Sequence, residues 1–361
     1  MPTAQLTTVN SIICSEIMNK KVGVIGMGSF GVAIANLLSN NTDVLLYSRS
    51  QEKIDKFNDD HFFKGITFKS NVTGTTDLQE IAVNCNLIFI LIPSASLRSL
   101  MKVLGPMLNP SKIIIHGIKG LDLESIDLDE PDLDKFDKKM VKTMSKVILE
   151  ESSIVRVGAL SGPNLAKEIL AGQPTATVLA SQFDEVIKIG QEKLSSDKFY
   201  VFGSKDVYGA EFAGVFKNII ALGTGILAGK GLGKNIQAML ITRGLREMII
   251  LGKLLNAKKR AFLGTAGIGD LIATATSDLS RNFTFGKRLG QGESMNEILS
   301  SINEVVEGVR TLKIAYLLSR KYNVPTPITY ILYKVVFDEF SVDHALTYLM
   351  RYPYADDVDF I

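Results

Sequence analysis

A glycine-rich turn between a β-branched run and an apolar run constrains this chain most strongly. Lys21–Ile25 reads Lys-Val-Gly-Val-Ile, Gly-Met-Gly-Ser-Phe-Gly follows, and Val32–Leu38 is largely apolar. Between a strand and a helix, the first glycine permits a tight turn, the second lets a ligand approach the backbone, and the third lets helix and strand pack. The helix N-terminus then presents N–H groups and partial positive charge to a diphosphate. We therefore predict that residues 21–49 form a dinucleotide-binding βαβ unit. Its turn is shaped by three glycines: Gly26, Gly28 and Gly31.

The end of the second expected strand bears on the choice of dinucleotide. The run Asp43–Tyr47 ends at Ser48-Arg49. An acidic residue usually stands at this place and accepts a hydrogen bond from the ribose 2′-hydroxyl of NAD, whereas an arginine accommodates a 2′-phosphate or stacks on adenine. The alternative is an ordinary surface arginine. The sequence therefore predicts NAD or NADP as the cofactor and leaves the choice open.

Continuous apolar runs indicate the rest of a sheet. Leu87–Ile92 and Lys112–His116 are typical of strands buried on both faces of a parallel sheet. Further strand-like runs at 154–161 and 176–180 flank Ser161-Gly162-Pro163-Asn164, which is a turn by composition. Because such runs alternate with helical stretches, the pattern predicts a doubly wound α/β domain.

From Tyr208 onward the pattern changes to long helical periods with few strand signals. The helices expected there are 207–229, 234–256, 267–276, 294–300, 305–322, 326–338 and 341–350. We expect a second domain that is entirely helical. The predicted boundaries are an N-terminal extension at 1–19, a dinucleotide-binding domain at 20–205 and a helical substrate domain at 206–361.

Composition and charge exclude several classes of protein. Of 361 residues, 40 are basic and 38 acidic, and this net charge of +2 lacks the basic excess of a nucleic-acid-binding surface. The two cysteines, Cys14 and Cys85, and the three histidines have no metal-ligand spacing, so we expect neither a metal site nor a disulfide framework. We find no apolar run of the roughly 18–20 residues that spans a bilayer and no secretory signal pattern. We therefore expect a cytoplasmic protein without membrane insertion, and a homodimer, since apolar helices in a domain of this size often pair.

The acidic segment 122–139, broken by Pro131, is expected to be a solvated surface loop or the lead-in to a helix.

Lys217 is a candidate buried amine in the helical half. It stands between Phe216 and Ile219 in an apolar helical stretch. Desolvation lowers the pKa of an ammonium, and a lysine so placed can act as a base near neutral pH. The alternative is a lysine that extends to the surface past its apolar neighbours.

Three further features are candidates for the same site. Asp270 ends the glycine-rich stretch 264–269 and is either a site carboxylate or a helix N-cap. Ser280-Arg281-Asn282 at a helix start suits a phosphate or another oxyanion, and ordinary helix capping is the alternative. Lys119 closes the fourth expected strand, at the sheet edge where ligands bind in open α/β sheets. A second cation there would also lower the pKa of Lys217.

These motifs together resemble the soluble NAD(P)-dependent glycerol-3-phosphate dehydrogenases, which interconvert dihydroxyacetone phosphate and sn-glycerol 3-phosphate. The resemblance runs from about residue 20 to about 340. It rests on the glycine turn, Lys119-Gly120, Leu160–Glu168, Lys217–Ala221, the Gly267–Asp270 turn and Ser280-Arg281-Asn282. It implies a Rossmann-type α/β N-terminal domain, an all-α C-terminal domain and a small phosphorylated substrate. It also implies that the product feeds glycerophospholipid synthesis.

The resemblance also implies roles for individual residues. Lys217 resembles the general base that takes the C2 hydroxyl proton while hydride leaves for nicotinamide, and Lys119 and Asp270 resemble groups that orient substrate and tune this lysine. The substrate-binding positions are Lys119, Gly162, Asn164, Lys217, Asp270, Ser280, Arg281 and Asn282. The cofactor-binding positions are Gly26, Gly28, Ser29, Phe30, Gly31, Arg49, Lys119, Ala166, Arg281, Val305 and Glu307.

Some residues depart from the family pattern. His61-Phe62-Phe63-Lys64-Gly65 stands where a Leu-Pro-Gly stretch is common, Asn164 replaces a more usual Ser or Thr, and a frequent Thr-Cys reads Thr274-Ala275. Two other hypotheses remain open. One is a lysine-dependent reductase of the 6-phosphogluconate or ketopantoate type, and the other is a cofactor-binding sensor without turnover. A histidine base of the lactate or malate type is disfavoured, because no histidine occurs in a plausible base position and His116 is the one histidine near the expected crevice.

Overall fold

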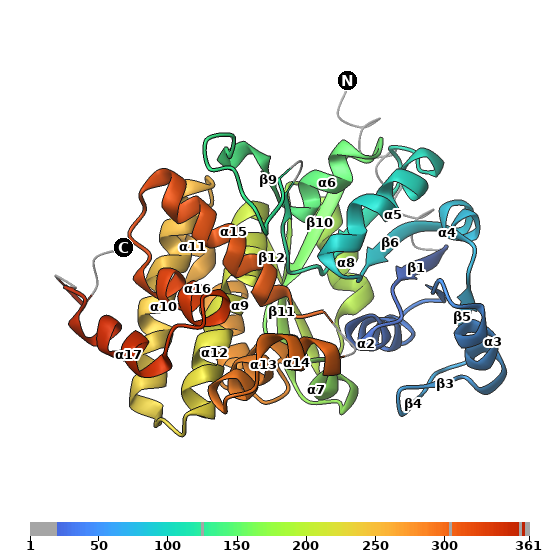
Figure 1. The fold of residues 1–361 in the computed structure, drawn as a ribbon. Coiled ribbons are helices and arrows are strands. Elements are labelled where there is room, and N and C mark those ends of the chain that lie inside the picture. The colour runs from blue at the N-terminus through green and yellow to red at the C-terminus, as the bar shows by residue number, and fades with distance from the viewer. Residues whose placement is uncertain (1–19, 124–125, 303–304, 354–355, 358–361) are drawn as a thin grey trace.

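The structure is a computed structural model that describes residues 20–361 except 124–125, 303–304, 354–355 and 358–361 (Figure 1). The expected N-terminal extension at 1–19 lies outside the described residues.

The described residues of the N-terminal half form an eight-stranded sheet. Its order is β12-β11-β10-β7-β6-β1-β2-β5, and neighbouring strands are parallel except β10 and β11. The strands are β1 (Lys21–Ile25), β2 (Val44–Tyr47), β5 (Val72–Thr75), β6 (Cys85–Ile90), β7 (Ile113–His116), β10 (Arg156–Ser161), β11 (Thr175–Ser181) and β12 (Phe199–Ser204). Two short hairpins lie outside it: β3 (Phe62–Phe63) with β4 (Ile66–Thr67), and β8 (Asp122–Leu123) with β9 (Val141–Lys142).

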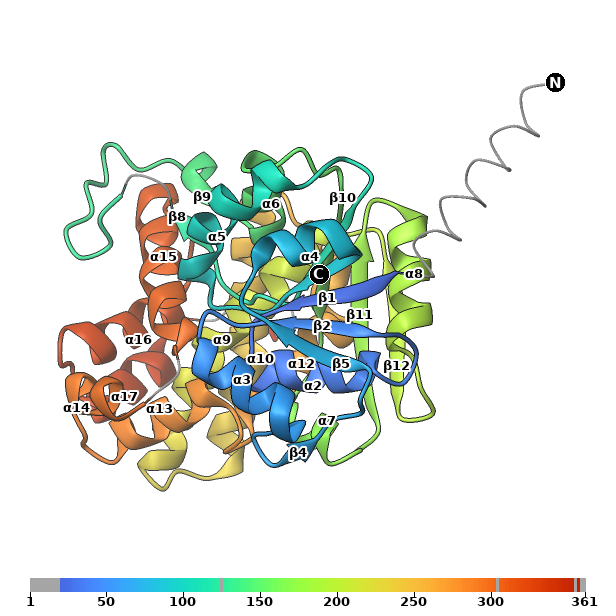
Figure 2. The same ribbon diagram turned by 90° about the vertical axis from the view of Figure 1, so that its right-hand side faces the viewer.

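Helices cover both faces of this sheet. The helices are α2 (Ser29–Leu38), α3 (Gln51–Asp60), α4 (Leu78–Asn84), α5 (Leu97–Leu104), α6 (Met144–Glu150), α7 (Ala166–Leu170) and α8 (Asp184–Leu194). Successive strand side chains point to opposite faces, so Phe89 packs in the core beneath α2 and α8 while Ile88 and Ile90 pack in the core beneath α4, α5 and α6. Figure 2 shows α4, α5 and α6 above β1 and β2, and α2 and α7 below these two strands. The predicted doubly wound α/β fold is confirmed.

The C-terminal half is built around one long buried helix, α9 (Val207–Gly229). It packs against α10 (Lys234–Leu254), α12 (Asp270–Ala275), α13 (Arg281–Gly290) and α15 (Glu307–Tyr322). The other helices are α11 (Lys259–Phe262), a π-helical turn (Thr265–Gly269), α14 (Met295–Ser301), α16 (Pro327–Phe337) and α17 (Val342–Arg351). The expected all-helical second domain is confirmed, and α13 is a helix that the periodicity did not delimit.

Glycines bring the backbones of α9 and α13 into direct contact. A Cβ at Gly225 would lie 2.1 Å from the carbonyl oxygen of Phe283, and one at Gly286 would lie 2.0 Å from that of Leu222. Because any larger side chain would separate the two helices, these glycines fix their crossing.

The helix α9 corrects one expectation from the sequence. It is long and apolar enough to cross a membrane by length and composition, although we expected no such run. In the structure 89% of its most apolar 18-residue window is buried inside the protein, as in the core helix of a globular domain.

Within the acidic segment 122–139, residues 126–137 form a surface loop, as predicted, but this loop is not solvated throughout. Phe136 is 1% exposed and belongs to the hydrophobic core of the helical domain. The backbone N–H of Lys138 donates to the hydroxyl of Tyr322 at 2.8 Å, and Lys321 Nζ donates to the carbonyl of Leu133 at 2.7 Å. The loop is therefore fastened to α15, because burying one phenylalanine outweighs the solvation of its acidic neighbours.

Candidate active site

The glycine turn has the geometry that a pyrophosphate requires. Gly26 has a φ of 121°, and a Cβ at Gly31 would lie 1.8 Å from the Gly26 carbonyl oxygen, so each position needs glycine. A Cβ at Gly28 would meet no atom within 4 Å, so space lies open beside it. Gly28 is the N-cap of α2 and no side chain caps this helix end. These residues therefore fit the diphosphate of a dinucleotide.

Four other proposed cofactor positions lie in the same domain as this turn. The Phe30 ring lies against Gly117 just after β7, since a Cβ at Gly117 would be 2.7 Å from it. Ser29 begins α2 and its hydroxyl accepts a hydrogen bond from Lys64 Nζ at 3.0 Å. Arg49 is exposed two residues after β2, and Ala166 begins α7, which packs against α2.

Lys217, Asp270 and Lys119 form one connected cluster where the two domains meet. Lys217 Nζ on α9 donates to Asp270 Oδ1 and, at 2.6 Å, to Thr274 Oγ1. Lys119 Nζ donates to Asp270 Oδ2 at 2.7 Å and to the carbonyl of Gly162 at 2.8 Å. One carboxylate thus holds two ammonium groups, one from each domain. Since Phe30 lies on Gly117, the cofactor turn is close to this cluster along the chain segment that carries Lys119.

Burial makes Lys217 unusual. Its side chain is 5% exposed, so the interpretation as a lysine that extends to the surface is wrong. Burial lowers the pKa of Lys217 to about 7, with the Asp270 carboxylate opposing this decrease and the Lys119 ammonium adding to it. Near neutral pH the amine can therefore both accept and donate a proton.

The interpretation of Asp270 as a helix N-cap is also wrong. The helical backbone already begins in the π-helical turn Thr265–Gly269, and Asp270 is the first residue of α12. Its two oxygens accept hydrogen bonds from lysine side chains instead. It is 1% exposed, which a carboxylate tolerates only when it is paired.

A chain of amides connects this cluster to α13 and α15. Asn218 Nδ2 donates to the carbonyl of Lys119 at 3.3 Å, and Asn282 Nδ2 donates to Asn218 Oδ1 at 2.9 Å. The N–H of Gly308 then donates to Asn282 Oδ1 at 2.9 Å. Ser94 adds a bridge between the domains, because its N–H and its hydroxyl donate to the two carboxylate oxygens of Glu307 at 2.8 and 2.7 Å.

The three residues proposed to bind the substrate phosphate, Ser280, Arg281 and Asn282, already form hydrogen bonds within the protein. The hydroxyl of Ser280 caps α13 by accepting from the N–H of Phe283 at 3.3 Å, which matches the capping alternative. The amide of Asn282 is held by the chain just described. Arg281 is exposed and donates through Nη1 to the carbonyl of Val305 at 3.1 Å, so the structure brings these two cofactor candidates together.

The substrate-binding candidates Gly162 and Asn164 lie in the segment between β10 and β11. Gly162 has a φ of 148°, and its carbonyl holds Lys119. Asn164 Nδ2 donates to Thr177 Oγ1 at 2.9 Å, while its buried Oδ1 has no hydrogen-bond partner among the described residues. A buried amide oxygen of this kind suits a donor group on a ligand.

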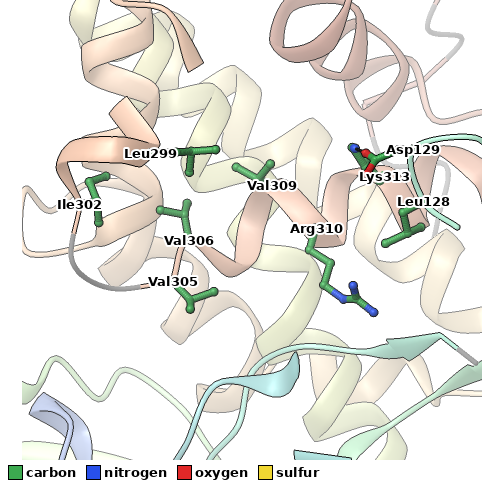
Figure 3. Close-up of a pocket in the computed structure, with 9 residues that line it drawn as sticks. All are labelled: Leu128, Asp129, Leu299, Ile302, Val305, Val306, Val309, Arg310 and Lys313. Atoms are coloured by element: carbon green, nitrogen blue, oxygen red, sulfur yellow. Dashed lines mark hydrogen bonds and ion pairs between the residues drawn. The ribbon is translucent and has the colours of Figure 1, made fainter. Parts of the chain in front are cut away.

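A hollow of about 500 Å³ lies beside Val305 (Figure 3). Aliphatic side chains of α14, α15 and the loop that joins them form one side, and Arg310, Lys313 and Asp129 form the other. Figure 3 shows Lys313 and Asp129 pointing toward each other, in agreement with their ion pair. The cofactor candidate Val305 therefore lines a recess at the edge of the site.

Sequence reasoning missed three participants. Thr274 stands four residues after Asp270, and this i,i+4 spacing puts both on one helix face, so the pattern could have indicated it. Asn218 follows Lys217 directly but was not assigned a contact, and nothing in the sequence connects Ser94 to Glu307. His116 lies outside this site. It is 1% exposed, and its Nε2 lies 3.0 Å from Ser145 Oγ and 3.2 Å from Glu211 Oε1, in a buried polar cluster of its own.

The protein has a glycine turn that fits a dinucleotide and a buried lysine that is hydrogen-bonded to a carboxylate. Together these features place it in the class of two-domain, dinucleotide-dependent oxidoreductases. Comparison with known proteins narrows this class. The family model described as NAD-dependent glycerol-3-phosphate dehydrogenase N-terminus matches residues 21–187, and the model of the C-terminus matches residues 206–347. The chain belongs to the NAD(P)-dependent glycerol-3-phosphate dehydrogenase family, and with it to the oxidoreductases that use NAD or NADP.

Individual relatives agree with this assignment. A glycerol-3-phosphate dehydrogenase [NAD(P)+] of Staphylococcus haemolyticus is 37% identical over 91% of this chain and 97% of its own length. The Staphylococcus aureus protein of the same name is 38% identical over 92% and 98%. A crystal structure of glycerol-3-phosphate dehydrogenase from Coxiella burnetii matches with a TM-score of 0.83 at 29% identity, over 92% of this chain and 99% of that one. A ketopantoate reductase from Ralstonia eutropha, with a TM-score of 0.52 at 14% identity, shares the fold alone.

Proposed function

We propose that this protein reversibly interconverts dihydroxyacetone phosphate and sn-glycerol 3-phosphate with NAD or NADP, and that Lys217 is its general acid and base. The observation that carries the proposal is the Lys217–Asp270–Lys119 cluster, in which burial lowers the pKa of Lys217 to about 7. Bound nicotinamide would accept or supply the hydride. The residues of this chain position the substrate and move the proton.

In the oxidative direction the neutral Nζ of Lys217 takes the proton of the C2 hydroxyl and becomes an ammonium. In the reductive direction the Lys217 ammonium returns this proton to the oxygen of the C2 ketone. Thr274 accepts a hydrogen bond from the same nitrogen and orients it. Asp270 keeps the amine in place in both states, and the Lys119 ammonium polarises the oxygen at C2.

Substrate phosphate would lie at the N-terminus of α13, beside Arg281. The Ser280 hydroxyl and the Asn282 amide already form hydrogen bonds within the protein, so they are less open to bind the phosphate directly. We therefore assign the charge to Arg281 and to the helix end, and the positioning to Asn282. Gly162 and Asn164 complete the substrate side, because the carbonyl of Gly162 holds Lys119 and the Oδ1 of Asn164 is open to a donor.

The test is oxidation of NADH or NADPH that depends on dihydroxyacetone phosphate. Lys217→Met should lower kcat by on the order of 10²-fold or more, because the methionine fills the same space without a proton to transfer. Cofactor affinity should persist in this variant. Lys230→Ala, at the C-cap of the same helix, is the matched control and should keep activity. Binding of cofactor without turnover of any phospho-ketone would favour the sensor hypothesis, and turnover of 6-phosphogluconate or ketopantoate would favour the related reductases.

We further propose that the protein is a cytoplasmic homodimer that supplies glycerol 3-phosphate for glycerophospholipid synthesis. Three aromatic residues on and around α17 line a second hollow and offer an apolar contact surface: Phe340 and Tyr348 are exposed, and Tyr352 is half-buried. Light scattering of the purified protein distinguishes a dimer from a monomer. Fractionation of cells and depletion of the protein, followed by measurement of phospholipid synthesis, test the other two statements.

A further inference from the structure

The β3–β4 hairpin carries a lysine in an uncommon backbone conformation. Phe63 pairs with Ile66, so Lys64 and Gly65 alone form the connection, with φ values of 51° and 81°. Two-residue hairpin turns with two positive φ values favour Asn-Gly, because asparagine and glycine tolerate the left-handed region. A lysine at the first position costs free energy, and such strain concentrates at functional sites. This hairpin lies in the stretch that departs from the family pattern.

Aromatic packing fixes the base of this hairpin. Phe68 is 5% exposed, and its ring meets that of Phe57 on α3 edge-on with a centroid distance of 5.1 Å. The N–H of Phe68 donates to the carbonyl of His61 at 2.7 Å, which closes the stem of the loop. Phe63 packs against the core of the α/β domain. The position of the hairpin tip is therefore set by the fold.

The tip of the hairpin places the ammonium group of Lys64 beside the N-terminus of α2, where the glycine turn ends. Lys64 Nζ lies 3.0 Å from the hydroxyl of Ser29, which is the first residue of α2. This helix end carries partial positive charge, and the space beside Gly28 is open. A cation next to a helix N-terminus is repelled by it, and an anion between the two would be attracted by both.

We propose that Lys64 binds the pyrophosphate of the cofactor, opposite the N-terminus of α2. The proposal rests on the assignment of the glycine turn as the cofactor site in the proposed function. Since NAD and NADP share the pyrophosphate, Lys64 contributes equally to both. Arg49 lies after β2, where the adenosine ribose is expected, and it carries the discrimination between the two.

Binding of NADH and NADPH to the whole protein, measured by nicotinamide fluorescence titration at several salt concentrations, tests this proposal. Lys64→Ala should raise both dissociation constants by about 5- to 20-fold, leave their ratio unchanged and reduce the salt dependence of binding. Arg49→Ala should weaken NADPH more than NADH. Lys69→Ala is the matched control, because Lys69 is a nearby lysine whose Nζ donates to Asn40 Oδ1 at 2.7 Å, and it should change neither constant by more than about 2-fold.

Lys64→Asn separates charge from backbone conformation. Asparagine suits the turn better than lysine, so this variant keeps the hairpin and removes only the cation. The proposal predicts that it weakens both cofactors as alanine does, whereas Lys64→Arg restores most of the affinity. Wild-type affinity in Lys64→Asn, or a loss confined to NADPH in Lys64→Ala, overturns it. The proposed function fails separately, if the wild-type protein binds both cofactors but does not turn over dihydroxyacetone phosphate.

Discussion

Replacing Asp270 by asparagine should move the pH dependence of catalysis in a defined direction. Asp270 stabilises the charged form of Lys217, and its removal lowers the pKa of that lysine further below about 7. An adjacent opposite charge shifts a pKa by about one to three units, or about 1.4–4 kcal/mol. The variant amine should therefore titrate between about pH 4 and 6. Asparagine retains one oxygen that can accept from Lys217, but its amide nitrogen cannot accept from Lys119, so the variant loses the hydrogen bond to Lys119 together with the charge.

The two directions of the reaction should respond oppositely. Oxidation requires the neutral amine, so wild-type kcat/KM for glycerol 3-phosphate should rise with pH through about 7 and then level off. In Asp270→Asn the plateau of kcat/KM should extend down to about pH 6 or below. Reduction requires the ammonium, whose fraction at pH 7 falls from about one half to between about a tenth and a thousandth. The reductive rate of the variant at pH 7 should therefore fall at least about fivefold.

Initial rates in both directions between about pH 5 and 9 measure these profiles. Asp278→Asn is the matched control, because Asp278 is a surface aspartate that pairs with Lys287, and its profiles should match those of the wild type. An inflection that stays near pH 7 in Asp270→Asn, or that moves upward, would refute the role assigned to this carboxylate.

Two other substitutions test single contacts. Thr274→Val keeps the shape of the side chain but removes the acceptor 2.6 Å from Lys217 Nζ, so kcat should fall by about tenfold while the thermal transition is unchanged; an unaltered kcat would exclude an orienting role. Glu247 is 2% exposed and accepts from the N–H groups of Ile328 and Thr329 and from the Thr329 hydroxyl. Glu247→Ala leaves these donors without an acceptor and should reduce the free energy of unfolding by about 2–3 kcal/mol in urea titrations, whereas Glu247→Gln should lose less.

Local patterns predicted those parts of the fold and site whose cause is local. The glycine spacing indicates a turn because only glycine fits at Gly26 and Gly31, and the apolar stretch around Lys217 indicates burial because its neighbours form the core. The strand β5 was not predicted, since Val-Thr-Gly-Thr is short and has no clear apolar pattern. The sequence also did not reveal the partners of Asn282, because they are set by how helices pack, whereas the cap formed by Ser280 is local and was one of the two alternatives that the sequence left open.

The acidic loop shows the same limit in another form. Its charge indicates exposure, and most of the loop is exposed, but the single Phe136 decides where it attaches. An average over a segment cannot reveal one anchoring side chain. Similarly, the bridge from Ser94 to Glu307 joins residues 213 positions apart, which only the relative placement of the two domains determines.

The glycine-mediated crossing of α9 and α13 has a consequence for how the two substrates meet. Lys217 lies on α9, and the proposed phosphate position lies at the start of α13. Backbone contacts at Gly225 and Gly286 hold these helices together. The distance between the Lys217 amine and the proposed phosphate position is therefore fixed, and this distance sets the length of substrate that fits. The glycine turn belongs to the other domain. Any hinge motion between the domains would therefore leave the length of the accepted substrate unchanged. It would alter the donor–acceptor distance for hydride transfer and the contacts that Lys119, Gly162 and Asn164 make from the other domain.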